Sequence, residues 1–363
     1  MSCSTSLPRC QCNGGNGKSV PRRQHGVALV LALLVVALVT AITVELSWRF
    51  DLSMIRSANR WHGVQANAYL NGAEELAFML LREDADKDKQ EGKEVDTLYE
   101  DWAGNYGQIP TDEGWVRGRL EDAQARFNIN LLAKKAPKPN ANKSQEPWQK
   151  WTAPQRRFIR LLQTLELAEE EFLDQATAEN ITEAIMDWID VDSEVTGFGG
   201  AESDYYGQLD IPFVVANKPM VSVSELNVIK GIFPVLYQKL LPLVIALPAE
   251  ATTNVNTMPL ELIRSINSKK VLYPITVEDA MYIFEERGAG YDDVEMFKSG
   301  IVKDVVDSSG NGNNLDTEGL GVNSSYFIFY GDTMVGDIVR ESKALFFREG
   351  AEVKTLRRSD ANF

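Results

Sequence analysis

The chain has 363 residues, of which 44% are hydrophobic and 25% charged, as is typical of a folded protein. Its 52 acidic and 37 basic residues give a formal net charge of −15, which discourages nucleic acid as a partner because phosphate binding depends on lysine and arginine. Only His25 and His62 are histidines, which excludes histidine-dependent nucleophilic catalysis and a histidine-ligated zinc site, so we expect no enzyme.

An uncharged run over residues 27–44 follows the basic pair Arg22 and Arg23. As a helix rising ~1.5 Å per residue it would measure about 27 Å, enough to cross most of a bilayer's hydrocarbon layer. The two arginines predict a cytoplasmic N-terminus, with the chain beyond Glu45 on the other side. A plain signal anchor, or a secretory signal cut after Ala41, would also explain this run.

The helical pattern continues beyond the apolar run. Apolar residues recur at steps of three, four and seven and predict one stripe on a helix; they are Trp48, Leu52, Ile55, Tyr69, Ala73, Leu76, Ala77 and Leu80. If it is continuous to Leu81, this helix is about 80 Å long. We expect half of it to protrude and half to pack. We expect it to end in the charged segment 82–93, which gives a transmembrane and stalk helix over residues 27–82.

This start resembles the type IV pilin class, in which basic residues and a glycine precede an apolar run that leads into a long amphipathic helix. The resemblance implies that a prepilin peptidase cuts after Gly26 and methylates Val27, so that residues 1–26 form a leader. The class normally carries a glutamate at the fifth mature position, where this chain has Leu31. That glutamate is thought to pair with the terminal amine of the subunit ahead, because an unpaired ammonium in lipid is costly. A subunit without it fits the tip of a fibre.

The missing glutamate and several later segments resemble the minor pseudopilin family called protein K of the type II secretion system. The segments are residues 125–132, 187–192, 200–206, 224–226 and 254–257. The resemblance implies an α+β, type IV pilin-like fold, with a long N-terminal helix packed on an antiparallel sheet and a large inserted all-helical domain. It also implies an inner-membrane protein whose partners are minor pseudopilins of the I and J types, other pseudopilins and the secretion platform. Its function would be to initiate and cap the pseudopilus for the export of folded proteins across the outer membrane.

The sheet is expected from segments at both ends of the exported part. Alternation predicts a strand over residues 114–122. Later strands are expected at residues 326–330, 335–341, 344–348 and 352–357, with turns at Gly331, Gly336 and Gly350. We assign residues 83–132 and 321–363 to the pilin-like domain, whose sheet can pack on the stalk helix.

Residues 133–320 are expected to form the inserted helical domain. A proline-containing stretch over residues 134–149 predicts a loop at its start. Capping-box spacing occurs at Ser222 with Glu225 and at Thr276 with Asp279. Gly231 and Gly288 stand where helix ends favour a residue that tolerates positive φ.

An acidic segment in this domain predicts a calcium site. Its candidate ligands are Asp190, Asp192, Glu194, Glu202 and Asp204, with Asp187 just before them and glycines at 197, 199 and 200. Calcium takes six to eight oxygen ligands on such flexible loops. The family resemblance also implies calcium, with a structural role. The alternative is a solvated acidic surface.

A second oxygen-rich segment could form another calcium loop, with Asp304, Asp307, Asn311 and Asp316 as candidate ligands. It lacks the EF-hand spacing and its terminal glutamate, so a flexible surface turn is the preferred interpretation.

An alternative function comes from residues 224–232 and 254–257, which resemble helix-hairpin-helix units that bind DNA phosphates. They would suit a membrane-anchored DNA-binding protein for DNA uptake. Phe233 stands where a second glycine is expected, and residues from Val27 onward carry a formal charge of −19. These features favour a protein that binds no nucleic acid. Cys3, Cys10 and Cys12 all precede Gly26, so a processed chain would contain no disulfide.

Overall fold

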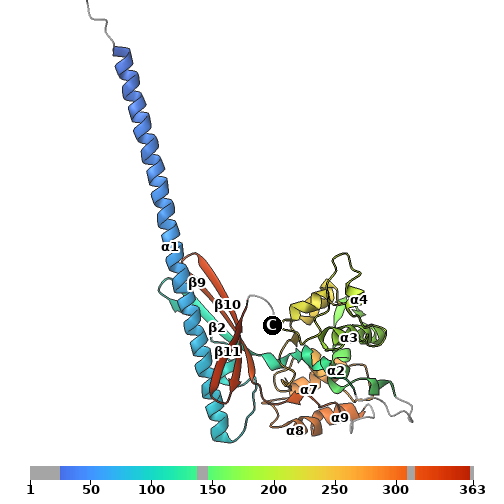
Figure 1. Cartoon of the computed structure of the whole chain (residues 1–363). Coiled ribbons are helices and arrows are strands. Elements are labelled where there is room, and N and C mark those ends of the chain that lie inside the picture. The colour runs from blue at the N-terminus through green and yellow to red at the C-terminus, as the bar shows by residue number, and fades with distance from the viewer. Residues whose placement is uncertain (1–24, 137–145, 309–314, 360–363) are drawn as a thin grey trace, which may run out of the picture. The chain divides into compact units, whose positions relative to one another are not determined.

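The computed structural model describes residues 25–136, 146–308 and 315–359 (Figure 1). The chain divides into two compact units, residues 1–61 and 62–363. In its described part the first unit is the portion of helix α1 (His25–Glu91) that precedes His62. The second unit contains the rest of α1, a five-stranded sheet and a mainly helical domain.

Helix α1 ends at Glu91, inside the charged segment where we expected its end but beyond the predicted limit of residue 82. Gly92 follows with φ of 70°, a left-handed conformation that glycine adopts readily at helix ends. The segment after α1 contains one short 3-10 helix, η1 (Asp101–Ala103), before the sheet begins.

The sheet is antiparallel and has the order β1-β2-β9-β10-β11. Its strands are β1 (Ile109–Thr111), β2 (Gly114–Asp122), β9 (Tyr326–Val335), β10 (Ile338–Glu349) and β11 (Glu352–Arg358). The bounds of β2 confirm the prediction for residues 114–122. The predicted C-terminal meander is confirmed as well, with three strands in place of four.

Gly331 lies inside β9, so the turn predicted there is wrong, whereas Gly336 and Gly350 occupy turns with φ of 56° each. The reason for a glycine at position 331 is space. A Cβ added there would lie 2.9 Å from the ring of Phe329 and 3.0 Å from Leu70 on α1. Gly118 on β2 is its cross-strand partner, so the strands present two residues without side chains where α1 approaches.

The part of α1 in the second unit packs its buried stripe on this sheet. Ala66, Leu70, Ala77 and Leu81 are buried, and the aromatic rings of the sheet complete the core on this side. These rings belong to Phe327, Phe329 and Phe346. The stripe differs from the prediction at Leu76, which is 44% exposed, because Leu70 and Leu81 occupy the face that the sheet covers.

The helical domain is inserted between β2 and β9 (Figure 1). Its helices are α2 (Ala153–Leu162), α3 (Gln175–Ile189), α4 (Ser203–Tyr206), α5 (Pro234–Leu240), α6 (Leu260–Arg264), α7 (Val277–Glu286), α8 (Val294–Ser299) and α9 (Ile301–Ser308). Its 3-10 helices are η2 (Ala123–Ala125), η3 (Ile129–Ala133), η4 (Pro147–Lys150) and η5 (Val223–Val228).

Short strand pairs show that this domain is not all-helical. They are β3 (Phe127–Asn128) with β6 (Val244–Ile245), β4 (Glu166–Ala168) with β5 (Glu171–Phe172), and β7 (Thr253–Asn254) with β8 (Leu320–Gly321). Phe127, Ile129 and Leu132 belong to the core of this domain. The chain therefore enters the core of the helical domain before residue 133, where the domain boundary was predicted.

The predicted local signals of the domain are present in the structure. Ser222 and Glu225 form a reciprocal capping box, although the element they cap, η5, is a 3-10 helix. Thr276 caps α7 by accepting a hydrogen bond from the Asp279 amide. Gly231 and Gly288 have φ of 86° and 54°. Within the predicted loop over residues 134–149, residues 137–145 lie outside the described part of the chain.

A buried polar junction connects the sheet to the helical domain. The carboxylate of Asp122, at the end of β2, accepts hydrogen bonds from Thr257 Oγ1 at 2.5 Å and Ser324 Oγ at 2.7 Å. Asn254 Nδ2 donates to the same carboxylate at 3.1 Å. Burial raises the pKa of Asp122, and these hydrogen bonds lower it in part. The junction fixes the point where the chain leaves the sheet.

Candidate functional site

The N-terminal half of α1 has the composition of a membrane span. An 18-residue window of this helix has a mean hydropathy of 3.0, and residues 26–51 are exposed. Among the described helices it alone is long and apolar enough to cross a membrane. Gly26 and Val27 lie in the first turn of α1. Cleavage between them stays a prediction.

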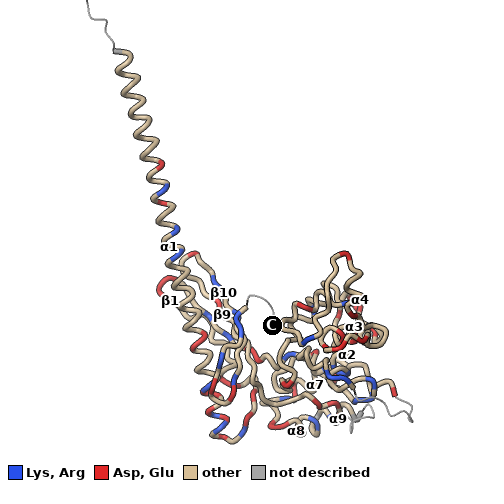
Figure 2. Tube along the Cα trace, viewed as in Figure 1, with Lys and Arg blue, Asp and Glu red and all other residues tan. Residues whose placement is uncertain are grey.

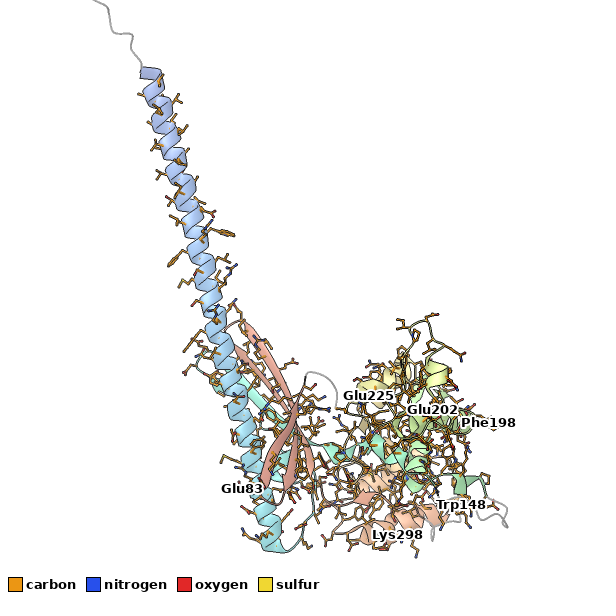
Figure 3. The ribbon with its side chains drawn as sticks, viewed as in Figure 1. Glu83, Trp148, Phe198, Glu202, Glu225 and Lys298 are labelled. Carbon is orange, nitrogen blue, oxygen red and sulfur yellow. The ribbon has the colours of Figure 1, made fainter. Side chains whose placement is uncertain are left out.

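The predicted calcium loop connects α3 to α4. Asp190 is the C-cap residue of α3, and Glu202 is the N-cap residue of α4. Both are buried, with 5% and 4% of their surfaces exposed. Figure 3 labels Glu202 within the helical domain. Neither carboxylate has a hydrogen-bond partner among the described residues. Lys135 Nζ lies 3.2 Å from Asp190, whereas Glu202 has no ion pair among the described residues. A buried carboxylate without a partner is costly, so a cation held here would stabilise the loop.

Glycines hold this loop against α3. A Cβ on Gly199 would lie 2.2 Å from the Asn180 backbone, and one on Gly200 would lie 2.4 Å from the Asp187 carboxylate. The Gly199 amide donates to Glu183 at 2.7 Å, and the Thr196 amide donates to Asp187 at 3.1 Å. Asp187 therefore shapes the loop from α3.

The carboxylates of the loop raise one another's pKa values. Burial first, and then the charges of Asp187, Asp190 and Asp192, raise the pKa of Glu202 to about 7. Burial also raises the pKa of Asp190. Lys135 Nζ lies 3.2 Å from Asp190 Oδ2 and also pairs with Asp192, so one cation already partly neutralises this group.

The oxygen-only donor set of Asp190, Asp192 and Glu202 fits a hard cation such as calcium. The other two predicted ligands do not join this group. Glu194 and Asp204 are exposed, and neither carboxylate makes an ion pair or hydrogen bond within the described part of the chain. Of the five predicted ligands, Asp190 and Glu202 are buried, whereas Asp192, Glu194 and Asp204 are exposed, and Asp192 shares Lys135 with Asp190.

The second predicted metal group is not assembled in this way. Asp316 is 4% exposed and is bound by Arg156, whose Nε and Nη2 donate to its two oxygens at 2.7 and 2.6 Å. Arg160 Nη2 adds a contact at 3.2 Å. Arginine side chains therefore bind both oxygens of this carboxylate. The prediction that Asp316 is a metal ligand is corrected, because Asp316 pairs with Arg156 and Arg160. Asp304 is exposed on α9, and Asn311 and the side chain of Asp307 lie outside what the structure describes.

Sequence reasoning missed a different acidic group. Among the described residues, Asp84, Asp96 and Glu100 form the one set of three carboxylates whose oxygens lie within 4.8 Å of one another. Arg348 on β10 donates to Asp84 at 2.7 Å and to Asp96 at 2.5 Å. Burial raises the pKa of Asp96 to about 6 and that of Glu100 to about 7. No local spacing signals this group, because its arginine comes from the distant end of the chain.

An apolar groove of about 330 Å³ lies beside α1 in the second unit. It is lined by Ala73 and Leu76 of α1, by Trp102 and Ile109, and by Val116 of β2, among other residues. The exposed Leu76 borders this groove, so the helix flank offers an apolar surface next to the sheet edge.

The segments that resemble DNA-binding hairpins have other roles. Residues 223–228 form the 3-10 helix η5. Asn254 and Asn256 are 0% and 2% exposed, and their amides donate to Asp122 and to the Tyr291 carbonyl. These side chains therefore stabilise the protein interior and are not available to a phosphate backbone.

Comparisons with known proteins agree with this architecture. Residues 125–249 match the family described as Type II secretion system (T2SS), protein K. The chain is 30% identical over 339 residues to type II secretion system protein K of Pectobacterium carotovorum subsp. carotovorum, covering 93% of this chain and 96% of that protein. The chain belongs to the type II secretion system protein K family.

Other members of the protein K family and a solved structure extend this result. The Pseudomonas aeruginosa protein is 38% identical over 240 residues, covering 65% of this chain and 66% of that protein. A chain in the crystal structure of the GspK–GspI–GspJ complex from enterotoxigenic Escherichia coli superposes with a TM-score of 0.62 at 26% identity, over 84% of this chain and 98% of that chain. The predicted family and the pilin-like α+β fold are confirmed.

Proposed function

We propose that this chain is a minor pseudopilin that initiates and caps the type II secretion pseudopilus, for the export of folded proteins across the outer membrane. The observation that carries this function is the continuity of α1. One helix begins as an uncharged segment of bilayer length and continues into the buried stripe of a pilin-like body. Family membership supports the same assignment. The role is structural and not enzymatic.

The tip position is supported by Leu31. A pseudopilin behind another subunit is expected to offer an acidic side chain to the terminal amine of the subunit ahead, because an unpaired ammonium in lipid is costly. Leu31 supplies no acceptor, so this chain takes no subunit ahead of it. Labelling the chain in purified fibres tests this position. Label at one end is expected, and label along the fibre length contradicts the proposal.

Processing and topology follow from the same helix. We expect a prepilin peptidase to cut after Gly26 and to methylate Val27, leaving the chain in the inner membrane with its bulk in the periplasm. N-terminal sequencing of protein from cells with and without the peptidase tests this step. A start at Val27 only in the first cells is expected. A start at Ile42 would indicate a secretory signal cut after Ala41, and an unprocessed chain would indicate a signal anchor.

The proposed partners are minor pseudopilins of the I and J types, with other pseudopilins and the secretion platform. The GspK–GspI–GspJ complex of the structural relative supports this set. The apolar groove beside α1 gives the partner helices a surface to pack against. Co-purification of the full chain with both partners in detergent is expected. A Leu76→Asp variant should weaken it, whereas Val339→Asp, at an exposed strand position, should not.

Calcium is proposed as a structural cofactor of the helical domain. Asp190, Asp192 and Glu202 would hold it, because the carboxylates of Asp190 and Glu202 are buried without hydrogen bonds and Asp192 shares Lys135 with Asp190. When bound, the ion would neutralise the mutual repulsion of these groups and stabilise the loop between α3 and α4. Lys135 would give up its contact with Asp190 and Asp192 to the ion.

A further inference from the structure

Three arginines of α2 are buried inside the helical domain. Arg156, Arg157 and Arg160 are 7%, 2% and 0% exposed. Blue positions, which mark lysine and arginine, lie on this helix in Figure 2. An arginine side chain stays charged at physiological pH and is almost never fully buried without a partner. Each of these guanidinium groups therefore requires acceptors inside the protein.

Two of the three guanidinium groups have such acceptors. Arg156 Nε and Nη2 donate to the two oxygens of Asp316 at 2.7 and 2.6 Å. Arg160 donates to the carbonyls of Ser265 and Ser268 at 3.1 and 2.7 Å and contacts Asp316 at 3.2 Å. Asp316 is therefore already shared by two arginines.

Arg157 lacks acceptors of this kind. Its Nη1 and Nη2 atoms are both buried, and neither has a hydrogen-bond partner among the described residues. Glu318 acts on the charge of Arg157, but the Glu318 carboxylate pairs with Lys134 at 2.5 Å, and 56% of its side chain is exposed. Water screens a carboxylate in that position. Arg157 is thus a buried cation that no carboxylate contacts in the described part of the chain.

The charges around Arg157 leave a positive excess. Burial lowers the pKa of Arg157 to about 10; Asp316 and Glu318 oppose this shift, and Arg160 and Arg156 add to it. The guanidinium is therefore still charged at neutral pH. Burying an ion without a partner is costly, so the fold favours an anion in contact with Arg157.

Gly319 leaves space beside this guanidinium. A Cβ added to Gly319 would lie 3.0 Å from Arg157 Nη2, and the next atoms, on Pro154 and Leu131, would be 3.8 and 3.9 Å away. The glycine, which precedes β8 and has φ of 77°, therefore keeps a side chain away from Nη2. The apolar atoms of Pro154 and Leu131 offer no hydrogen bond to a hydrated ion. They favour an anion of low charge, because the cost of removing water rises with charge.

We propose that Arg157 binds a small monovalent anion, such as chloride, as a structural ligand of the helical domain. The anion would accept hydrogen bonds from Nη1 and Nη2 and neutralise the charge that Asp316 leaves over. A water molecule could accept the same hydrogen bonds but would bring no negative charge. The site is separate from the predicted calcium loop, whose candidate ligands are carboxylates.

The test compares thermal unfolding of the full chain in detergent micelles in sodium chloride and in sodium gluconate at equal concentration, with calcium held constant. Gluconate is the control anion, because it is too large for a space beside a buried side chain. Chloride should raise the melting temperature by about 3 °C or more, and the rise should grow with chloride concentration. Arg157→Met removes the charge and should abolish the difference. Arg264→Gln alters another arginine of this domain that donates to carbonyl oxygens, and it should preserve the difference.

A second comparison separates loss of the anion from loss of packing. In gluconate, Arg157→Met should be at least as stable as the unaltered chain, because it buries no unpaired charge. If this variant does not fold, crystals of the unaltered full chain grown in sodium bromide decide, and an anomalous peak next to the Arg157 guanidinium is expected. Equal melting temperatures of the unaltered chain in the two salts would overturn the proposal in favour of a buried water. An undiminished chloride effect in Arg157→Met, or no bromide at this position, would overturn it as well.

Discussion

Asp96 and Arg348 form a buried ion pair at 2.5 Å although 252 residues separate them in the chain. Asp96 is 0% exposed and Arg348 7%. The same guanidinium donates to Asp84 near the end of α1 and to the Ser324 carbonyl before β9. One arginine therefore ties together the end of the long helix, the segment after it, and the C-terminal strands.

Replacing this arginine should destabilise the protein strongly. Arg348→Gln leaves Asp84 and Asp96 buried without a cation, which should cost about 3–5 kcal/mol of unfolding free energy. Arg117→Gln is the control, because its pair with Asp332 is partly exposed and should contribute about 0–1 kcal/mol. Urea unfolding followed by circular dichroism measures both. Similar losses in the two variants would mean that the Arg348 pairs contribute no more than a surface contact.

Gly331 on β9 and Gly72 on α1 predict opposite effects of the same substitution to alanine. Gly331→Ala puts a methyl group 2.9 Å from the Phe329 ring, so the helix or ring must shift and stability should fall by about 1–3 kcal/mol. Gly72→Ala in α1 meets no atom within 4 Å and should stabilise the helix by about 0.5–1 kcal/mol. Thermal unfolding of the two variants checks the sign of each effect. A neutral Gly331→Ala would show that the packing is loose.

Calcium should raise the melting temperature through Glu202. We expect calcium to shift the thermal transition upward by several degrees relative to chelator. Glu202→Gln should abolish most of the shift, because it removes a buried ligand. Glu194→Gln should preserve it, because Glu194 is exposed and apart from the buried carboxylates. Loss of the shift in both variants would indicate that Glu194 is also a calcium ligand. No shift in the unaltered chain would contradict the calcium proposal.

The raised pKa values predict a definite pH dependence in chelator. Glu202 and Glu100 have folded pKa values of about 7, above their ordinary range of about 4.3 when unfolded. Their destabilising effect is fully present above pH 7 and is relieved as pH falls below it, so unfolding free energy should rise from pH 8 to pH 6. Glu202→Gln should flatten this slope, whereas Glu194→Gln should not. A slope of opposite sign would contradict the burial of these groups.

The calcium effect should show the reverse trend in the same pH window. Protons compete with the ion for Glu202, so the stabilisation given by calcium should shrink as pH falls through about 7. Melting temperatures with and without calcium at pH 8 and pH 6 measure this difference. An equal calcium effect at both values would assign the binding to carboxylates with ordinary pKa values.

Local chemistry made part of this fold predictable. The bounds of β2 follow from the alternation of its residues, and the Ser222 box and the Gly336 turn each depend on residues close in sequence. Gly331 was misassigned because a glycine that makes room for a neighbouring helix looks the same in sequence as one that makes a turn. Leu76 was misplaced because periodicity gives the stripe but not its rotation against the sheet.

The candidate sites also differ in whether their residues lie close together or far apart in the sequence. Asp190 follows the end of α3 and Glu202 precedes the start of α4, close together in sequence, so a local acidic pattern could indicate them. Asp316 was misread because its arginine partners lie on α2, far away in sequence. The Arg348 pairs were missed for the same reason, because Asp84 lies on α1 and Asp96 in the segment after it, far in sequence from β10.

The insertion point of the helical domain has an architectural consequence. The chain leaves the sheet at Asp122 and returns at Phe327, and these two residues face each other across β2 and β9. A short loop that joined these two residues could replace the inserted helical domain and keep every strand pairing of the sheet. Removing the helical domain would expose the apolar side chains of Ile328 and Leu345, which now pack against Ile245 and Leu247. The inserted domain is thus joined to the sheet through buried contacts, because its removal would also take Thr257 and Asn254 away from the Asp122 carboxylate.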